Sequence, residues 1–204
     1  MHTKLRRNAM SVLRKTNDGA VMGWIAGVDG CKGGWIAALC DADFEKPPAI
    51  EVFRDFASIL NDERAPAIVA VDMPIGLPDW TGGRGRGPEE AVRSSLGRLR
   101  NSVFSIPSRS AVYAVDRPVV GLEDITQSHA VACEIARRTS GLQAAFSRQA
   151  FMIFPKIREV DRLLRESLEI RPRVHEIHPE VAFWSMNGER PLQFAKKEAA
   201  GEAE

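Results

Sequence analysis

The sequence predicts an α/β fold, and three features support this prediction. The first is a β-hairpin over Trp24–Leu39, where two short apolar runs surround a Gly-rich turn. The second is Ala67–Val71, a continuous apolar run that is typical of a strand covered on both faces. The third is a pair of amphipathic helices, Leu122–Thr139 and Pro155–Leu168, whose apolar stripes suit packing on a core.

Further elements follow in order along the chain. Ile50–Phe53 is expected to be a third strand, and Asp55–Leu60 a short helix with one apolar face. Glu89 and Glu90 are expected to open another short helix that ends near Gly97. Gly141 is placed where a cap for the Leu122–Thr139 helix belongs.

Size and composition limit the classes of protein to consider. The 204 residues are 44% hydrophobic, enough for one sizeable core or two small ones. The net charge of +1 indicates no particular partner, so any nucleic-acid surface must come from local clustering of basic residues. No apolar run approaches the roughly 20 residues that a membrane helix needs, so no membrane partner is expected. Oligomeric state is left open.

The cysteines and the first residues bear on location and domain limits. Cys31, Cys40 and Cys133 are odd in number and widely spaced, which fits a reducing cytoplasm better than a disulfide framework. Residues 1–22 are basic and contain no apolar signal region, so we expect a disordered extension there. Residues 23–204 are expected to form a single domain.

Two aspartates lie where predicted buried strands end. The hairpin's first strand ends in Asp29, and the run Ala67–Val71 ends in Asp72. Open α/β sheets bind their ligands at the carboxyl ends of strands, and a carboxylate beside a core strand is costly unless a cation or donors meet it. The alternative for Asp29 is that it caps the turn.

The segment from Gly82 to Arg109 is rich in arginine and glycine. Arginine is suited to bidentate contact with phosphate, whereas the alternative is a solvated basic loop. We expect an ordered loop that holds phosphates, together with Lys32 of the hairpin turn. The candidate substrate-binding residues are Lys32, Arg84, Arg86, Arg98, Arg100 and Arg109.

The stretch Arg173–Glu180 is expected to be a strand followed by a helix that begins after Pro179. Strand alternation puts Glu176 and His178 on one face and His175 on the other. Considered alone, Glu176 and His178 would more often be structural residues with hydrogen-bond partners than ligands. A ligand role is favoured for Glu176 because it is the third acid near a strand end, after Asp29 and Asp72.

Several motifs together resemble a known family. They are G-V-D-G-C-K-G-G-W at 27–35, V-D-M-P-I-G-L-P at 71–78, S-V-F-S-I-P-S-R at 102–109, Q-A-F-M-I-F-P-K-I-R-E-V-D at 149–161 and H-E-I-H-P-E at 175–180. In this order they resemble a domain of unknown function whose members are described as predicted nucleases of RNase H-like fold. The resemblance covers the chain from about Met22 onward.

The resemblance implies a mixed five-stranded sheet flanked by helices. Strands 1 to 3 would form an antiparallel meander, and strands 4 and 5 would be parallel to strand 1. The ends of strands 1 and 4 would then lie side by side, and strand 5 would bring Glu176 to the same rim. Clustered carboxylates repel one another unless a proton or cation lies among them, and Mg²⁺ or Mn²⁺ is the natural occupant.

The sequence also departs from this pattern. RNase H-like nucleases commonly carry a last acid on a C-terminal helix, whereas residues 196–204 are polar and show no helical stripe. The chain is therefore either a fragment or lacks a helix that would complete the site. Glu180 and Glu89 are the candidates to substitute for that acid.

The first hypothesis is a metal-dependent nuclease or phosphodiesterase that acts on nucleic acid. Its catalytic residues would be Asp29, Asp72, Glu176 and His178, with His178 as a proton shuttle, and Glu180 would join the three acids as a metal ligand. One alternative is a nucleotide-binding phosphotransferase of actin-like fold, which needs two such domains where 204 residues supply one. Another is a catalytically silent nucleic-acid-binding module.

Overall fold

The computed structural model describes residues 14–15, 21–82, 85–140 and 146–190. The chain divides into two compact units. Unit 1 runs to Ile75 and includes Glu159–Ile177, and unit 2 consists of Gly76–Arg158 and the chain from His178 onward. We describe each unit by itself, and the predicted single domain stays a prediction.

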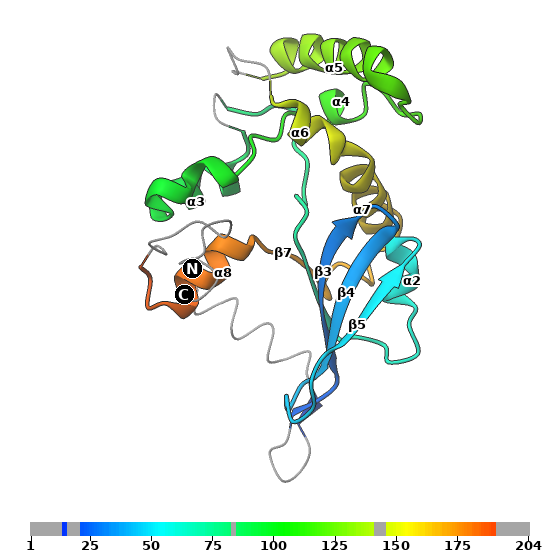
Figure 1. Ribbon diagram of the computed structural model, residues 1–204, viewed down its shortest axis with the longest axis vertical. Coiled ribbons are helices and arrows are strands. Elements are labelled where there is room, and N and C mark those ends of the chain that lie inside the picture. Colours follow the sequence, from blue (N-terminus) through cyan, green and yellow to red (C-terminus); the bar gives the residue numbers. More distant parts are fainter. Residues whose placement is uncertain (1–13, 16–20, 83–84, 141–145, 191–204) are drawn as a thin grey trace. The chain divides into compact units, whose positions relative to one another are not determined.

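Unit 1 contains a five-stranded mixed sheet with the order β5-β4-β3-β6-β7. The strands are β3 (Trp24–Cys31), β4 (Gly34–Asp41), β5 (Ala49–Phe53), β6 (Ile68–Val71) and β7 (Val174–Glu176). The first three form an antiparallel meander, β6 is parallel to β3, and β7 is parallel to β6. This confirms the predicted sheet and its strand directions. Figure 1 shows β3, β4 and β5 side by side, with the helix α2 (Phe56–Leu60) next to them.

One face of this sheet is buried. Ala26 and Val28 of β3 alternate with exposed positions, and Trp35 of β4 and Val71 of β6 belong to the same buried face. The core over this face includes Phe56, whose ring meets that of Trp35 edge-on at 5.0 Å between centroids. Period-two burial therefore fixes which face each strand residue occupies.

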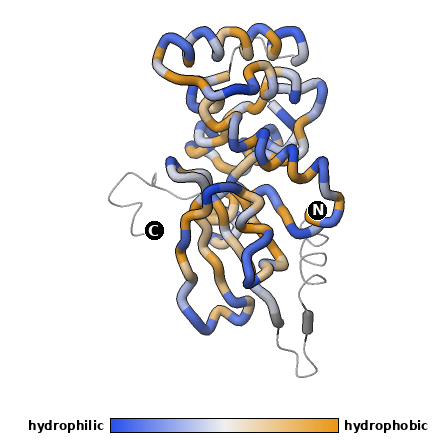
Figure 2. The backbone as a smooth tube through the Cα atoms, turned by 90° about the vertical axis from the view of Figure 1, so that its right-hand side faces the viewer, coloured by the Kyte–Doolittle hydropathy of each residue, from blue (hydrophilic) through white to orange (hydrophobic). Residues whose placement is uncertain are grey.

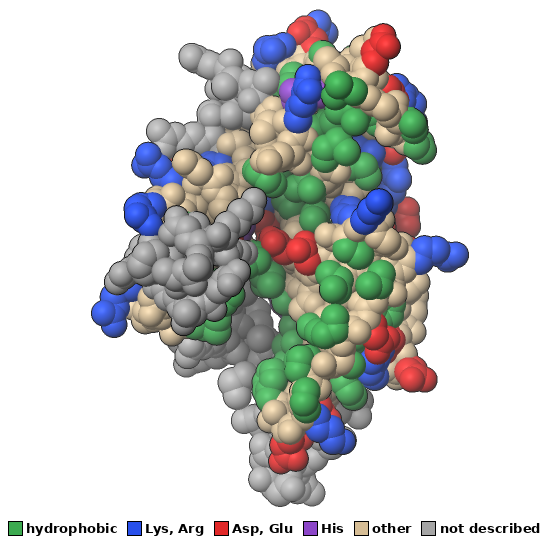
Figure 3. Space-filling view, viewed as in Figure 1, with side chains coloured by type: hydrophobic (Ala, Val, Ile, Leu, Met, Phe, Trp, Pro, Cys, Tyr) green, Lys and Arg blue, Asp and Glu red, His purple; other side chains and the backbone are tan. Residues whose placement is uncertain are grey.

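The other face of the sheet carries exposed apolar side chains. Ile36 of β4 is 37% exposed, and Ile50 and Val52 of β5 are 59% and 62% exposed. Figure 3 shows hydrophobic side chains gathered on the surface over these strands. This is the face on which the candidate site begins.

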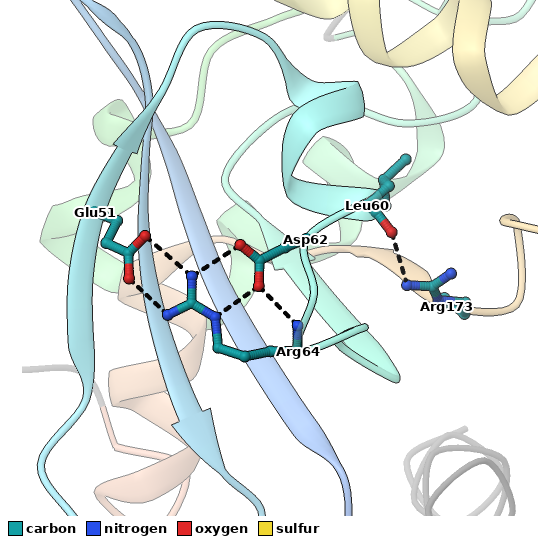
Figure 4. Close-up of polar contacts among 5 residues, drawn as sticks. All are labelled: Glu51, Leu60, Asp62, Arg64 and Arg173. Carbon is teal, nitrogen blue, oxygen red and sulfur yellow. Dashed lines mark hydrogen bonds and ion pairs between the residues drawn. The ribbon is translucent and has the colours of Figure 1, made fainter.

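Hydrogen bonds and ion pairs hold the end of the sheet where β6 and β7 begin (Figure 4). Arg64 donates to both carboxylate oxygens of Glu51, at 2.6 and 3.0 Å, and to both oxygens of Asp62, at 2.6 and 2.8 Å. Arg173 donates to the Leu60 carbonyl at 3.3 Å. The two carboxylates raise the pKa of Arg64, and Arg64 lowers the pKa of both Glu51 and Asp62.

Unit 2 is helical. Its elements are α3 (Gly87–Ser95), the 3-10 helix η1 (Gly97–Ser102), α4 (Arg109–Val112), α5 (Gly121–Arg138), α6 (Arg148–Met152) and α8 (Pro179–Met186). The helix α7 (Phe154–Glu166) begins in unit 2 and ends in unit 1. Figure 2 shows hydrophobic positions alternating with hydrophilic ones along α5, as its amphipathic sequence predicts.

Most predicted helices and strands are present, with shifted ends. α5 ends at Arg138 with Thr139 as its cap, and Gly141, the predicted capping residue, lies outside the described residues. α7 ends at Glu166, and Leu168, which was expected on its apolar stripe, is 66% exposed.

The predicted disordered extension falls mostly outside the described residues. Within it the structure describes only β1 (Arg14–Lys15) paired antiparallel with β2 (Val21–Met22). No helix in the described ranges is both long enough and apolar enough to cross a bilayer.

Candidate functional site

Asp29 lies at the carboxyl end of β3, on the exposed face of the sheet. Val28 is buried on the opposite face, and the alternation puts Gly27 and Asp29 on the exposed one. The Asp29 Oδ1 atom accepts a hydrogen bond of 2.6 Å from the backbone N–H of Gly30. The predicted turn-capping contact is thus present. This contact involves the Oδ1 atom alone, so the Oδ2 atom of Asp29 can still bind a ligand.

Asp72 follows β6 at the same end of the sheet. β3 and β6 pair in parallel with Val28 opposite Val71, and the Asp72 N–H donates to the Val28 carbonyl at 2.9 Å. Continuing this register by one residue puts Asp29 and Asp72 side by side on one face. Neighbouring strands lie about 4.8 Å apart, so both side chains can reach a shared ligand. Asp72 is half-buried, whereas Asp29 is exposed.

Glu176 reaches the same end of the sheet from the other face. β7 pairs with β6 so that Glu176 lies opposite Val71, and Val71 belongs to the buried face. The Glu176 Oε2 atom accepts a hydrogen bond of 2.8 Å from the N–H of Ile75, in the loop that follows Asp72. Glu176 therefore helps to order this loop. Its predicted role as a third metal ligand stays a prediction.

Within the described residues, no three His, Cys, Asp or Glu side chains are grouped so that they could hold one metal ion. Asp29 and Asp72 form a pair of candidate ligands. Mg²⁺ is commonly bound by one or two carboxylates, while water and substrate phosphate oxygens complete its octahedral shell. The pair therefore fits this kind of site, although it does not fit an all-protein cage.

His175 was not among the sequence-predicted site residues, yet it shares the face of the two aspartates. It pairs with Ala70 of β6, and Ala70 pairs with Gly27 of β3. The strand alternation in the sequence already separated His175 from Glu176. What the sequence alone could not show is which of the two faces carries the aspartates.

Glu159 is a second residue that sequence reasoning missed. Its carboxylate accepts the indole N–H of Trp35 at 3.1 Å and the backbone N–H of Phe56 at 2.5 Å. Trp35 and Phe56 are fully buried, so Glu159 connects α7, β4 and the start of α2 within the core of unit 1. It lies inside the 149–161 motif, but its partners are 124 and 103 residues away along the chain.

Comparison with known proteins adds a family. The family model described as "Protein of unknown function (DUF429)" matches residues 27–204. The chain belongs to the DUF429 family. Neither a curated protein nor a solved structure matches the chain. The family description states no activity, so the predicted nuclease function and the RNase H-like name are not part of what this match shows.

In this DUF429 protein, His178 and Glu180 belong to unit 2 and lie at the start of α8. The His178 Nδ1 atom is 3.0 Å from Glu180 Oε2, and the two side chains are 24% and 13% exposed. Such a pair can orient an imidazole and stabilise its protonated form. The proton-shuttle role of His178 and the metal-ligand role of Glu180 stay predictions.

The arginines of the 82–109 segment differ in burial and in the groups they contact. Arg86 is 4% exposed and forms a buried ion pair with Glu89, its Nη2 atom 2.6 Å from Oε1. We therefore correct the prediction for Arg86, because a guanidinium in an interior ion pair is not presented to an external phosphate. The same pair occupies Glu89, which argues against its use as a substitute metal ligand.

The other predicted cationic residues vary in exposure. Arg109 is half-buried, and its Nη2 atom donates to the Leu77 carbonyl at 2.7 Å. Arg98 and Arg100 are exposed on η1, and Lys32 is exposed in the β3–β4 turn of unit 1. Arg84 lies outside the described residues. Of the predicted substrate-binding residues that the structure describes, Lys32, Arg98 and Arg100 are thus exposed enough to meet a phosphate.

Proposed function

We propose that the protein is a divalent-metal-dependent phosphodiesterase that acts on nucleic acid. The observation that carries this proposal is the placement of Asp29 and Asp72 on one face at the carboxyl ends of two adjacent parallel strands. Carboxylate oxygens are the ligands that Mg²⁺ and Mn²⁺ prefer. The mixed sheet is also the arrangement expected for an RNase H-like nuclease, which supports the proposal at the level of fold.

In this proposal Asp29 and Asp72 hold Mg²⁺ or Mn²⁺. The ion would supply charge neutralisation at the scissile phosphate and activation of water. Lys32, exposed three residues after Asp29, would contact a phosphate as a point charge. Glu176 would act by holding the Ile75 amide and with it the loop that begins at Asp72.

Taken by itself, unit 2 has exposed Arg98 and Arg100 as candidate contacts for nucleic-acid phosphates and the His178–Glu180 pair as a candidate proton-transfer pair. Phosphate contacts of this kind give affinity without sequence preference and weaken steeply with salt. The salt dependence of nucleic-acid binding is therefore a second measurable property of the proposed enzyme.

The test is Mn²⁺-dependent cleavage of end-labelled single-stranded DNA, RNA and duplex DNA by the wild type and by Asp29→Asn and Asp72→Asn. Asp43→Asn is the matched control, because Asp43 is exposed beyond the end of β4, where Asp41 pairs with Trp24 at the other end of β3. We expect cleavage by the wild type and by Asp43→Asn, and at least a hundredfold loss in the other two variants. Wild type that cleaves no substrate but binds ATP with Mg²⁺ would instead favour the phosphotransferase alternative.

A further inference from the structure

The exposed face of the sheet carries a strip of small residues directly below the aspartate pair. Gly27, Ala70 and His175 form one row across the parallel strands β3, β6 and β7. Asp29 and Asp72 lie two positions further along the same strands, on the same face. His175 is therefore the polar residue at the β7 end of this row, next to the small residues Gly27 and Ala70.

The space above this strip is open at Gly27. A Cβ atom built on Gly27 has no heavy atom within 4 Å outside its chain neighbours. Glycine in a strand interior weakens the strand, and it often marks a place where a ligand or another backbone approaches closely. Among the described residues no other backbone lies within 4 Å of that Cβ, so Gly27 leaves room for a ligand to approach the strand.

The ring of His175 supplies a second, independent observation. Its Nε2 atom is buried and has no hydrogen-bond partner among the described residues. A buried polar atom without a partner is destabilising, so it is expected to pair when the site is complete. Residues diagonal to each other on neighbouring strands lie about 7–8 Å apart, a distance that an aromatic side chain spans. His175 can thus approach a group bound beside Asp72.

We propose that the ligand site extends from Asp29 and Asp72 over Gly27 and Ala70 to His175, whose Nε2 hydrogen-bonds a phosphate oxygen of the ligand. This inference rests on the proposed function for the identity of the ligand as a phosphate ester. His175 is a binding residue for the phosphate in this arrangement. It is not a metal ligand, in agreement with the lack of a three-residue metal group among the described residues.

The experiment adds side-chain volume at Gly27 and leaves every polar side chain of the proposed site unchanged. Gly27→Ala and Gly27→Val add a Cβ where nothing described lies within 4 Å, and a β-branched residue suits a strand. The melting temperature should therefore stay the same or rise.

Thymidine 5′-monophosphate, which a phosphodiesterase cannot cleave further, is titrated by calorimetry in the presence of Mn²⁺. The affinity for Mn²⁺ is measured separately by electron paramagnetic resonance.

We expect nucleotide affinity to fall progressively, by at least tenfold in Gly27→Val, with Mn²⁺ affinity within threefold of the wild type. His175→Phe, which keeps an aromatic ring but no nitrogen, should weaken the nucleotide about tenfold and leave Mn²⁺ affinity unchanged, and His175→Gln should restore part of the loss. Val52→Ile is the control, because it enlarges an exposed side chain of the same face on β5, two strands from Gly27, and should change neither affinity.

The outcomes separate this inference from the proposed function. Wild type that binds Mn²⁺ and nucleotide, with Gly27→Val indistinguishable from it, overturns the extended site and leaves the metal site intact. Wild type that does not bind Mn²⁺ overturns the proposed function. Nucleotide binding that is independent of Mn²⁺ but lost in Gly27→Val supports the extended site and removes the metal from it.

Discussion

At the scale of single residues, Asp29 and Asp72 should behave as ligands rather than as structural groups. Asp29→Asn keeps the oxygen that accepts the Gly30 N–H and removes a charge beside a second acid. Without metal, we expect both Asn variants to melt at or above the wild-type temperature. With Mn²⁺, the wild-type melting temperature should rise by binding linkage, and the variants should not respond.

A structural aspartate would give the opposite result. If wild type ignored Mn²⁺ and both variants lost about 1–3 kcal/mol of stability, the charge-assisted hydrogen bonds of these residues would be the reason for their presence. Thermal melts of the three proteins with and without Mn²⁺ decide between the two roles.

Glu176 should act through the loop that it holds. Glu176→Gln keeps an oxygen that can accept the Ile75 N–H, whereas Glu176→Ala removes it. We expect Glu176→Ala to cost about 1 kcal/mol and to speed amide exchange at Ile75, with a much smaller effect in Glu176→Gln. Equal exchange at Ile75 in both variants would contradict this role.

At the scale of elements, Glu159 joins three of them by accepting two buried N–H groups. Glu159→Ala would remove the carboxylate that accepts from the Trp35 indole and the Phe56 amide, which should cost about 3 kcal/mol, since the loss of a buried donor's acceptor costs roughly 1–3 kcal/mol. Urea unfolding measures the loss. Glu159→Gln, which retains one carbonyl oxygen, should lose less than half as much.

The turn between β3 and β4 depends on Gly34. Its φ is +130°, and a Cβ there would lie 2.1 Å from the Phe53 carbonyl oxygen and 2.7 Å from that of Arg54. We expect Gly34→Ala to cost more than about 3 kcal/mol, because backbone atoms cannot move aside as a flexible side chain can. Gly33→Ala is the control, since its Cβ would meet only Val52 Cγ1 at 3.5 Å. Similar urea midpoints for both variants would contradict the steric argument.

The same elements show how far the sequence could predict the structure. Periodicity located the strands and the long helices, because burial imposes a period of two on strands and 3.6 on helices. The resemblance, rather than periodicity, supplied the order and direction of the strands. Register is different: a shift of one residue moves every side chain to the other face, and no local pattern fixes it. That is why the sequence could not show that Glu176, although at the same end of the sheet, lies on the opposite face from Asp29 and Asp72, and why His175 was overlooked.

Burial of charged residues was equally hidden from the sequence. Arg86 and Glu89 are three residues apart, a spacing that allows an ion pair, but nothing local indicates that both are excluded from water. The composition of the segment favoured a phosphate-binding loop. Charge counts do not distinguish an arginine that meets a ligand from one that holds the protein together.

At the scale of the whole molecule, each unit carries an arginine–carboxylate cluster that makes folding depend on pH. In unit 1 Arg64 lowers the pKa of Asp62 and Glu51, and in unit 2 Arg117 lowers the pKa of Asp124. A carboxyl whose pKa is lower in the folded protein than in the unfolded chain stabilises the fold above its unfolded pKa. This stabilisation is lost as the pH falls through the folded value.

The ordinary pKa values of these groups, 4.5 for Glu51 and 3.8 for Asp62, set where the loss begins. We therefore expect the free energy of unfolding to be steady from pH 7 to about 5 and to fall steadily below pH 4.5.

Arg64→Gln removes the group that lowers both pKa values in unit 1. It should reduce stability at pH 7 and make the curve flatter between pH 4.5 and 3, so that variant and wild type converge in acid. Arg54→Gln is the matched control, because Arg54 is 92% exposed and its ion pair is with its neighbour Asp55. Urea unfolding at pH 7, 5, 4 and 3 gives the four points needed, and parallel curves for Arg64→Gln and wild type would show that the cluster does not control acid stability.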